Sequence, residues 1–214
     1  MQYQLSDVQH SDAEVLVRKC EIPANRRDPL RTIMFPNANA RLSEEDEEIV
    51  KWTVESLQES LENNVCYFRK VMLGLDFYVG YAVWSLEYGS QGMKKAPAPD
   101  MRCESWNPAT LDTRAWAEVS DRLREERKRV LHGQQTIWRL TSIQVAPEHQ
   151  RKGIGSMLMQ WGCDKADLNR WNSFVMASPA GVPLYHKFGF KETGQVWTEL
   201  GIFKSMFRES KKAV

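Results

Sequence analysis

The sequence predicts a mixed α/β fold, and two features carry that prediction. From residue 137 the chain alternates as strand (IWRLTSIQVAP), helix (GIGSMLMQWGCDKADL), strand (SFVMASP), short helix (AGVPLYHKFG) and two closing strands (FKETGQVW and GIFKSMF). A strand, a helix and a further strand in this order imply a parallel pair joined by a right-handed crossover. Residues 77–88, FYVGYAVWSLEY, are aromatic or β-branched almost throughout, which is typical of a strand covered on both faces.

The first third of the chain is predicted to be helical with one irregular break. Ser11 and Glu14 fit a capping box that opens a short helix. Residues 22–37 contain three prolines and indicate an irregular connection. A looser capping pair, Ser43 with Asp46, precedes apolar residues at helical spacing, which predicts a helix over 43–63.

The middle of the chain is predicted to hold two strands, a loop and a helix. Residues 65–73 and 77–88 are the strands, and 89–112 lack periodicity and indicate a loop. Residues 112–133 show a helical apolar stripe, and their mixed charges favour a solvated face over a binding patch. We expect a single domain over 1–214, with an insertion at about 89–136.

Composition excludes several classes of function. Lys and Arg number 29 and Asp and Glu 28, so the net charge of +1 offers no field that would recruit nucleic acid or an anionic membrane. The four cysteines form no CxxC pair, so no metal site is predicted. We find no signal peptide and no run of 18 apolar residues, and therefore expect a cytoplasmic protein.

The predicted strand IWRLTSIQVAP (residues 137–147) has irregular spacing of its apolar residues. Leu140 and Ile143 are three residues apart, so a regular strand would place them on opposite faces. A β-bulge near Thr141 and Ser142 would place both in one core and turn backbone groups away from the ladder. Alternatively, Leu140 faces the other covered side of the sheet, and the spacing itself favours neither interpretation.

The turn after this strand indicates an anion site. Pro147 ends the pairing, and Gly153 and Gly155 open a helix whose unpaired N–H groups attract phosphate, with Arg151 and Lys152 at the rim. A P-loop would need Lys and Ser or Thr after the second glycine, and a dinucleotide fingerprint would need a third glycine. Neither is present, and two glycines by themselves are also compatible with an ordinary helix start.

The whole stretch LTSIQVAPEHQRKGIGSMLMQWG, together with ASPAGVPLYHKFGF, resembles the GNAT superfamily of acyl-CoA N-acyltransferases. The resemblance covers about residues 140–190 and implies a twisted sheet of about 6–7 strands, splayed at a bulged central strand, with helices on both faces. It also favours the bulge at Thr141 and Ser142. The implied cofactor is acetyl-CoA, with its pyrophosphate over the glycine turn and its pantetheine along the bulged strand.

The resemblance also implies which residues form the site. The Val145 N–H would polarise the thioester carbonyl, and Tyr185 would donate a proton to the departing thiolate. The implied cofactor-binding set is Ile143, Gln144, Val145, Gln150, Arg151, Lys152, Gly153, Ile154, Gly155, Ser156, Ser178 and Tyr185.

Two departures from the family pattern affect the expected chemistry. Many members carry an acid at the bulge, where this chain has Thr141 and Ser142, and an Asn where it has Ser178. A general base would then act through water at Ser142 or come from elsewhere. Glu87 is one candidate, although it also fits a solvated glutamate at a strand end.

We therefore expect an N-acetyltransferase that acetylates a primary amine in a ternary complex. A small-molecule amine is favoured over a protein amine, and it would be recognised by residues 22–42, the insertion and the last hairpin. The alternative is a non-catalytic acyl-CoA-binding sensor or scaffold. The sequence does not indicate an oligomeric state.

Overall fold

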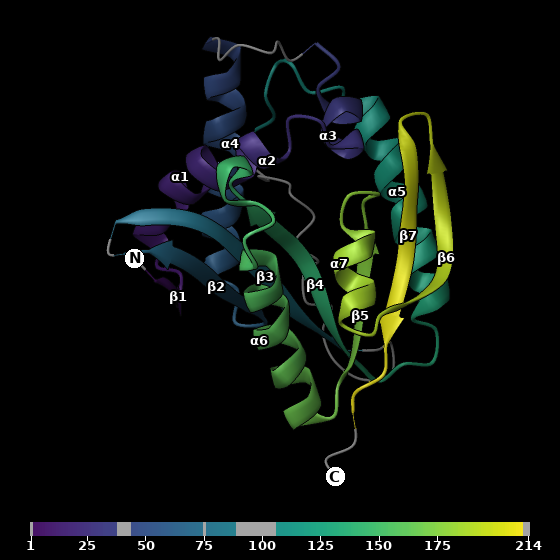
Figure 1. Ribbon diagram of the computed structural model, residues 1–214. Helices are drawn as coiled ribbons and strands as arrows, with labels where there is room; N and C mark the ends of the chain where they lie inside the picture. Colours follow the sequence, from purple (N-terminus) through teal and green to yellow (C-terminus); the bar gives the residue numbers. More distant parts are fainter. Residues whose placement is uncertain (1, 38–43, 75, 89–105, 212–214) are drawn as a thin grey trace.

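A seven-stranded sheet forms the centre of the molecule (Figure 1). The computed structural model describes residues 2–37, 44–74, 76–88 and 106–211. The strand order is β1-β2-β3-β4-β5-β7-β6, and the one parallel pair is β4 with β5 among the strands described. The strands are β1 (Tyr3–Ser6), β2 (Cys66–Leu73), β3 (Phe77–Tyr88), β4 (Thr136–Val145), β5 (Asn172–Ala177), β6 (Lys191–Thr198) and β7 (Gly201–Arg208). The predicted mixed α/β fold and parallel crossover are confirmed.

Helices cover both faces of the sheet. One face packs against the N-terminal helices and α4, and the other packs against α6 and α7. α5 lies behind β6 and β7 in Figure 1 and contacts both strands. The helical segments are η1 (His10–Asp12), α1 (Ala13–Leu16), η2 (Val17–Glu21), α2 (Ile22–Ala24), α3 (Pro29–Met34), α4 (Glu44–Leu61), α5 (Thr113–Val130), η3 (Pro147–His149), α6 (Ile154–Asn169) and α7 (Val182–Lys187).

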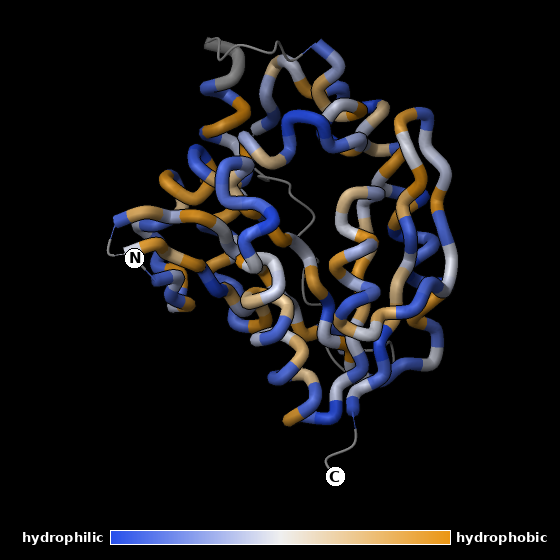
Figure 2. Tube along the Cα trace, viewed as in Figure 1, coloured by the Kyte–Doolittle hydropathy of each residue, from blue (hydrophilic) through white to orange (hydrophobic). Residues whose placement is uncertain are grey.

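The central strand β3 shows why the sheet has two cores. Tyr81 and Val83 belong to the core under the N-terminal helices, whereas Ala82 and Trp84 belong to the core under α6. This alternation follows from the two-residue period of a strand. Residues 79–86 are all buried, so the prediction that both faces of this strand are covered is confirmed. In Figure 2 hydrophobic and hydrophilic residues are interspersed along the strands and helices, and several turns are hydrophilic.

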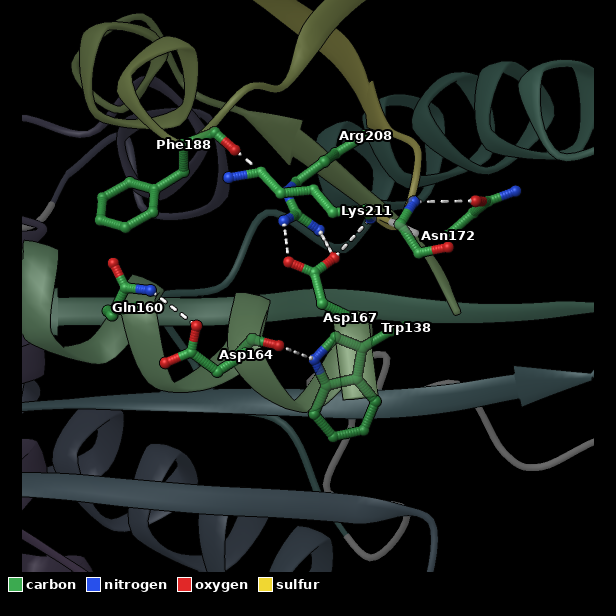
Figure 3. A network of polar contacts seen from close by, with 10 residues as sticks. Trp138, Gln160, Asp164, Asp167, Asn172, Phe188, Arg208 and Lys211 are labelled. Carbon is green, nitrogen blue, oxygen red and sulfur yellow. Dashed lines mark hydrogen bonds and ion pairs between the residues drawn. The ribbon is translucent and has the colours of Figure 1, made fainter. Parts of the chain in front are cut away.

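α6 is held along its C-terminal half by polar contacts (Figure 3). Arg208 at the end of β7 makes a bidentate ion pair with Asp167, with N–O distances of 2.9 and 2.6 Å. The buried indole of Trp138 donates to the Gly162 carbonyl at 3.0 Å. Together these contacts fix α6 against the sheet, and therefore fix where its N-terminus lies.

Four expectations about the helices need correction or stay open. Gln9 and Asp12 form the first capping box, because the helical turn begins earlier than Ser11 and Glu14 suggested. Residues 22–37 are not wholly irregular, since Asp28 caps α3 and Pro29 occupies its first turn, where a missing N–H costs nothing. The sequence places Leu168 with Ile154, Leu158 and Trp161 on one apolar face of a helix, but Leu168 is 85% exposed. The cap expected at Ser43 and Asp46 lies outside the described residues and side chains.

The other elements agree closely with expectation, with one omission. The helices over 43–63 and 112–133 and the strands over 65–73 and 77–88 are confirmed to within a few residues. Several charges of α5 pair with one another on its exposed side, as predicted for a solvated face. Glu126 and Arg129 also contact the last two strands, through Ser205 and the Thr193 carbonyl. β1 was not predicted, because four residues with mixed polarity give no strand signal. Most of the loop expected at 89–112 lies outside the described residues. No helix in the described part of the chain is long and apolar enough to cross a membrane.

Candidate functional site

A bulge in β4 shapes the centre of the candidate site. Ser142 pairs with Val83 and Leu140 pairs with Trp84, so Thr141 is an extra residue in β4. The Thr141 hydroxyl donates to the Val83 carbonyl at 2.9 Å, which fixes the irregularity. Leu140 and Ile143 consequently pack in the same core. The bulge interpretation of the apolar spacing is therefore confirmed.

Beyond the bulge, β4 separates from β5. Their pairing runs from Ile137 to Leu140, whereas β4 continues to Val145. The Ala146 N–H donates to the Val79 carbonyl at 2.9 Å, and backbone groups alternate in direction along an antiparallel strand. The backbone groups of Ile143 and Val145 therefore face away from β3, into the opening towards β5. The Val145 carbonyl there accepts from the Gln150 side chain at 3.1 Å.

The turn after β4 presents backbone N–H groups. Arg151 and Gly153 have φ angles of 62° and 88°, and Lys152 between them has a negative φ. Alternation of this sign makes successive amides converge into an anion-binding concavity. A left-handed φ is sparsely populated for a residue with a side chain, and such strain clusters at functional sites. The turn leads directly into the N-terminus of α6, whose dipole also favours an anion.

The side chains of this turn are either exposed or buried, and one side chain of β4 before the turn has a polar partner. Gln150, Arg151 and Lys152 are exposed, whereas Ile154 is 1% exposed and packs in the core, so that its backbone alone faces the turn. Gln144 donates to the Ser142 hydroxyl at 3.3 Å.

Gly155 and Ser156 both contact α7. A Cβ on Gly155 would lie 3.2 Å from Leu184, so this glycine allows α7 to approach α6. Lys187 of α7 donates to Ser156 in the first turn of α6 at 3.2 Å. The sequence did not indicate Lys187, because its contact with Ser156 depends on how α7 packs on α6.

Tyr185 lies in α7 with its side chain 5% exposed, beside Phe190 at 6.1 Å between ring centroids. Burial, and then the negative charge of Asp28, raise the pKa of Tyr185 well above its ordinary value. Asp28 accepts from the N–H groups of Leu30 and Arg31 and from Ser178. Burial nevertheless raises the pKa of Asp28. The cap of α3, the end of β5 and α7 thus meet around one carboxyl group.

The β6–β7 hairpin also contacts the region around Asp28 and Tyr185. A Cβ on Gly201 would lie 3.3 Å from both Pro29 and Pro179. The start of α3, the link from β5 to α7 and the β6–β7 turn therefore converge beside Tyr185. The segments expected to recognise an acceptor, 22–42 and the last hairpin, are adjacent here.

A buried carboxyl group that the sequence did not point to lies on the other side of the bulge. Glu21 ends η2 and is 5% exposed, and the buried Tyr81 hydroxyl donates to it. Tyr81 is also hydrogen-bonded to Ser142 on the bulge. Burial raises the pKa of Glu21, although the hydrogen bond from Tyr81 and the charge of Arg31 partly offset it. The one available signal was an acid standing alone between Cys20 and Ile22.

Glu87 does not belong to this arrangement. It lies near the far end of β3 and forms an ion pair at 2.8 Å with Arg139, whose side chain is 9% exposed. Glu87 is therefore neither a solvated strand-end glutamate nor a neighbour of the bulge.

The folded chain has the architecture of the GNAT acetyltransferases. A structure of histone acetyltransferase HPA2 and related acetyltransferase from Corynebacterium glutamicum matches with a TM-score of 0.64 at 13% identity, covering 100% of this chain and 99% of that one. Arylalkylamine N-acetyltransferase 2 from Aedes aegypti matches with a TM-score of 0.66 at 12% identity, covering 99% and 100%. A GNAT superfamily phosphinothricin acetyltransferase from Sinorhizobium meliloti, solved in complex with AcCoA, matches with a TM-score of 0.53 at 13% identity, covering 98% and 89%. At these identities the likeness shows the fold alone.

The sequence itself supplies the more specific match. Residues 116–192 match the family model of the acetyltransferase (GNAT) domain, a range that contains the bulge, the glycine turn and Tyr185. No curated protein matches the sequence at a significant level. The resemblance to the GNAT superfamily is thereby confirmed, by sequence over 116–192 and by fold over the described chain.

Proposed function

We propose that the protein is an N-acetyltransferase that moves the acetyl group of acetyl-CoA to a primary amine. The observation that carries this proposal is the continuous run from the bulged edge of β4 to the N-terminus of α6. It offers outward-facing backbone groups at Ile143 and Val145, followed by a turn of converging amides. An extended amide chain that ends in a pyrophosphate needs this order of partners.

The residues present fit coenzyme A. Ile143 and Val145 would pair with the pantetheine as a neighbouring strand does, and the amides of 151–156 would bind the pyrophosphate with Arg151 and Lys152. Ser178, at the end of β5, would bond the pantetheine from the other side of the opening. Acetyl-CoA would supply a thioester carbonyl as the electrophile, and the amine would attack it directly while both are bound.

Two groups of the chain would assist the transfer. The Val145 N–H faces the opening and would donate to the carbonyl oxygen as negative charge develops, a contribution of about 3 kcal/mol. Tyr185 would give its proton to the departing sulfur. Its raised pKa supports this role, because the phenol stays protonated until a strong base is present.

The acceptor would enter where α3, the β5–α7 link and the β6–β7 turn converge. The carboxyl group of Asp28 beside this entrance favours an amine that arrives as a cation. We propose a small molecule, because this entrance is built from three short segments packed against one another. Residues 1–214 would form one domain with an insertion at about 89–136, and cytoplasmic localisation stays a prediction.

Calorimetric titration with acetyl-CoA, followed by thiol release with a panel of small amines, tests this function. We expect acetyl-CoA to bind, with ATP and NAD as ligands that do not. Ligand at 100 times its dissociation constant should stabilise the fold by about 2.7 kcal/mol. Failure to bind millimolar acetyl-CoA would refute the proposal. Binding without turnover on any small or peptide amine would support the sensor instead.

A further inference from the structure

The buried carboxyl group of Glu21 has no part in the mechanism described so far. It lies at the end of η2, a π-helical segment, and such segments occur frequently at functional sites. An ionised carboxylate in so buried a place is costly unless it is paired or protonated. Its carboxylate accepts a hydrogen bond from the hydroxyl of Tyr81, a residue that is 1% exposed and lies 60 residues further along the chain.

Tyr81 connects Glu21 to the bulge. The Tyr81 hydroxyl donates to Glu21 and accepts from Ser142, while Ser142 accepts from Gln144 at 3.3 Å. Ser142 is half-buried, at the strand position where β4 opens away from β5. A chain of hydrogen bonds thus runs from the opening between β4 and β5 to the buried carboxyl group of Glu21. Each donor in this chain points towards Glu21.

Few other charges face Glu21. Arg31 of α3 lowers its pKa, as does the hydrogen bond from Tyr81, and burial is the larger and opposite effect. Cys20, on the same segment, has its pKa raised to about 12 by burial first and then by Glu148 and Glu21, so it stays a neutral thiol. Among Ser142, Tyr81 and Glu21, the carboxyl group of Glu21 is the one that can accept a proton passed along the two hydroxyl groups.

We propose that Ser142, Tyr81 and Glu21 form a relay that removes a proton from the acceptor amine, an inference that rests on the proposed function. An N–H bond of the ammonium breaks, and its electron pair stays on nitrogen for the attack. The proton passes to the Ser142 oxygen as the proton of Ser142 passes to Tyr81 and that of Tyr81 passes to the Glu21 carboxylate. Both hydroxyl groups end neutral, and Glu21 holds one additional proton.

Glu21→Gln and Tyr81→Phe test the relay at its two buried members. We expect each to lower kcat/KM at pH 7 about 100-fold, and the double variant to lose no more than either single one. The loss should shrink as pH approaches the pKa of the amine, because a neutral amine needs no base. A purely structural role would not produce this recovery with pH.

Tyr78→Phe is the matched control. Tyr78 lies on the same strand and donates at 2.7 Å to another buried carboxylate, that of Asp12, away from the bulge. The Tyr78→Phe variant should leave the pH profile of kcat/KM unchanged. All variants should bind acetyl-CoA as the wild type does. If the wild type transfers acetyl groups and Tyr81→Phe has the same rate and pH profile as the wild type, the relay is refuted. The proposed acetyltransferase function is then retained. If the wild type neither binds acetyl-CoA nor turns over, the proposed function itself fails.

Discussion

The two sides of the proposed site are assembled in different ways. The cofactor side is one uninterrupted stretch, residues 143–156, in which a strand, a turn and a helix follow one another. The acceptor side joins parts that are far apart in sequence: Asp28 with Ser178, Tyr81 with Glu21, and Pro29 with Gly201. One side is set by local backbone geometry, and the other by how the N-terminal helices pack on the sheet.

This difference separates the backbone conformation of the cofactor side, which must stay constant, from the side chains of the acceptor side, which can vary. A pyrophosphate needs converging amides, which depend on φ angles and tolerate few changes. An amine needs a carboxylate and a proton acceptor within reach, and side chains from many positions can supply them. The family motif accordingly matches this chain at the turn. In the proposed relay, Glu21 of η2 would supply the carboxyl group that the bulge lacks.

Tyr185 lies where the two sides meet, and its replacement should have the largest effect. We expect Tyr185→Phe to lower kcat about 100-fold with the dissociation constant for acetyl-CoA unchanged, because the ring still packs while the proton donor is lost. Steady-state kinetics beside calorimetry would measure this. Tyr67→Phe, which removes a phenol from the same apolar cluster, serves as the control. Equal losses in the two variants would mean that Tyr185 acts through packing.

Gly153→Ala examines the cofactor side. The site has room for a Cβ, but φ is 88°, and the left-handed region costs a residue with a side chain about 1–2 kcal/mol. Acetyl-CoA binding should therefore weaken about tenfold, because the complex must restore the strained turn. At Gly155 φ is helical and the nearest atom is the mobile end of Leu184, so Gly155→Ala should change affinity less. The reverse order would show that close approach, and not φ, explains the glycines.

The same contrast explains what the sequence could predict. Strand periodicity and the Gly153 turn are local patterns, and they predicted the fold and an anion site. The spacing of Leu140 and Ile143 left the bulge undecided, and the family resemblance favoured it. Asp28 and Lys187 resemble the charged residues of any exposed helix, and the one signal at Glu21 was its position between Cys20 and Ile22. Their importance arises from packing η2 on β3, α3 on α7 and α7 on α6. The prolines in residues 22–37 predicted an irregular connection. Pro29 instead lies in the first turn of α3, where proline is compatible with a helix.

Asp28 allows the acceptor side to be divided into two contributions. Asp28→Ala removes the cap of α3 and a charge beside Tyr185, and caps contribute about 1 kcal/mol. We expect KM for the amine to rise about fivefold, with acetyl-CoA affinity unchanged. Asp28→Ser keeps a capping oxygen without the charge. Recovery of KM in the serine variant would assign the effect to the cap, and no recovery would assign it to the carboxylate.

Glu21 should also affect stability, with a sign opposite to that of an ordinary surface carboxylate. Its folded-state pKa is raised by burial, so the folded chain holds this proton more tightly than the unfolded chain does. The contribution of Glu21 to stability is then complete below about pH 4.3, the unfolded value, and is lost as pH rises from there through its folded pKa. Gln carries no charge to bury, so Glu21→Gln should match the wild type near pH 4 and exceed it at pH 8. Thermal unfolding at both pH values would measure this as about 2–4 °C for each kcal/mol.

Glu192 provides the opposite case for the same measurement. A hydrogen bond from Lys204 lowers its pKa, so Glu192→Gln should lose stability as pH rises, where Glu21→Gln gains it. The difference between Glu21→Gln and the wild type should stop growing once pH passes the folded pKa of Glu21. A difference that still grows between pH 7 and pH 8 would mean that the folded chain keeps Glu21 protonated there. Glu21 could then not accept the amine proton, and the relay would be excluded by a measurement that needs no substrate. A difference that levels off below pH 7 would mean that the folded chain keeps a destabilising charge at Glu21, which is expected of a group retained for its chemistry.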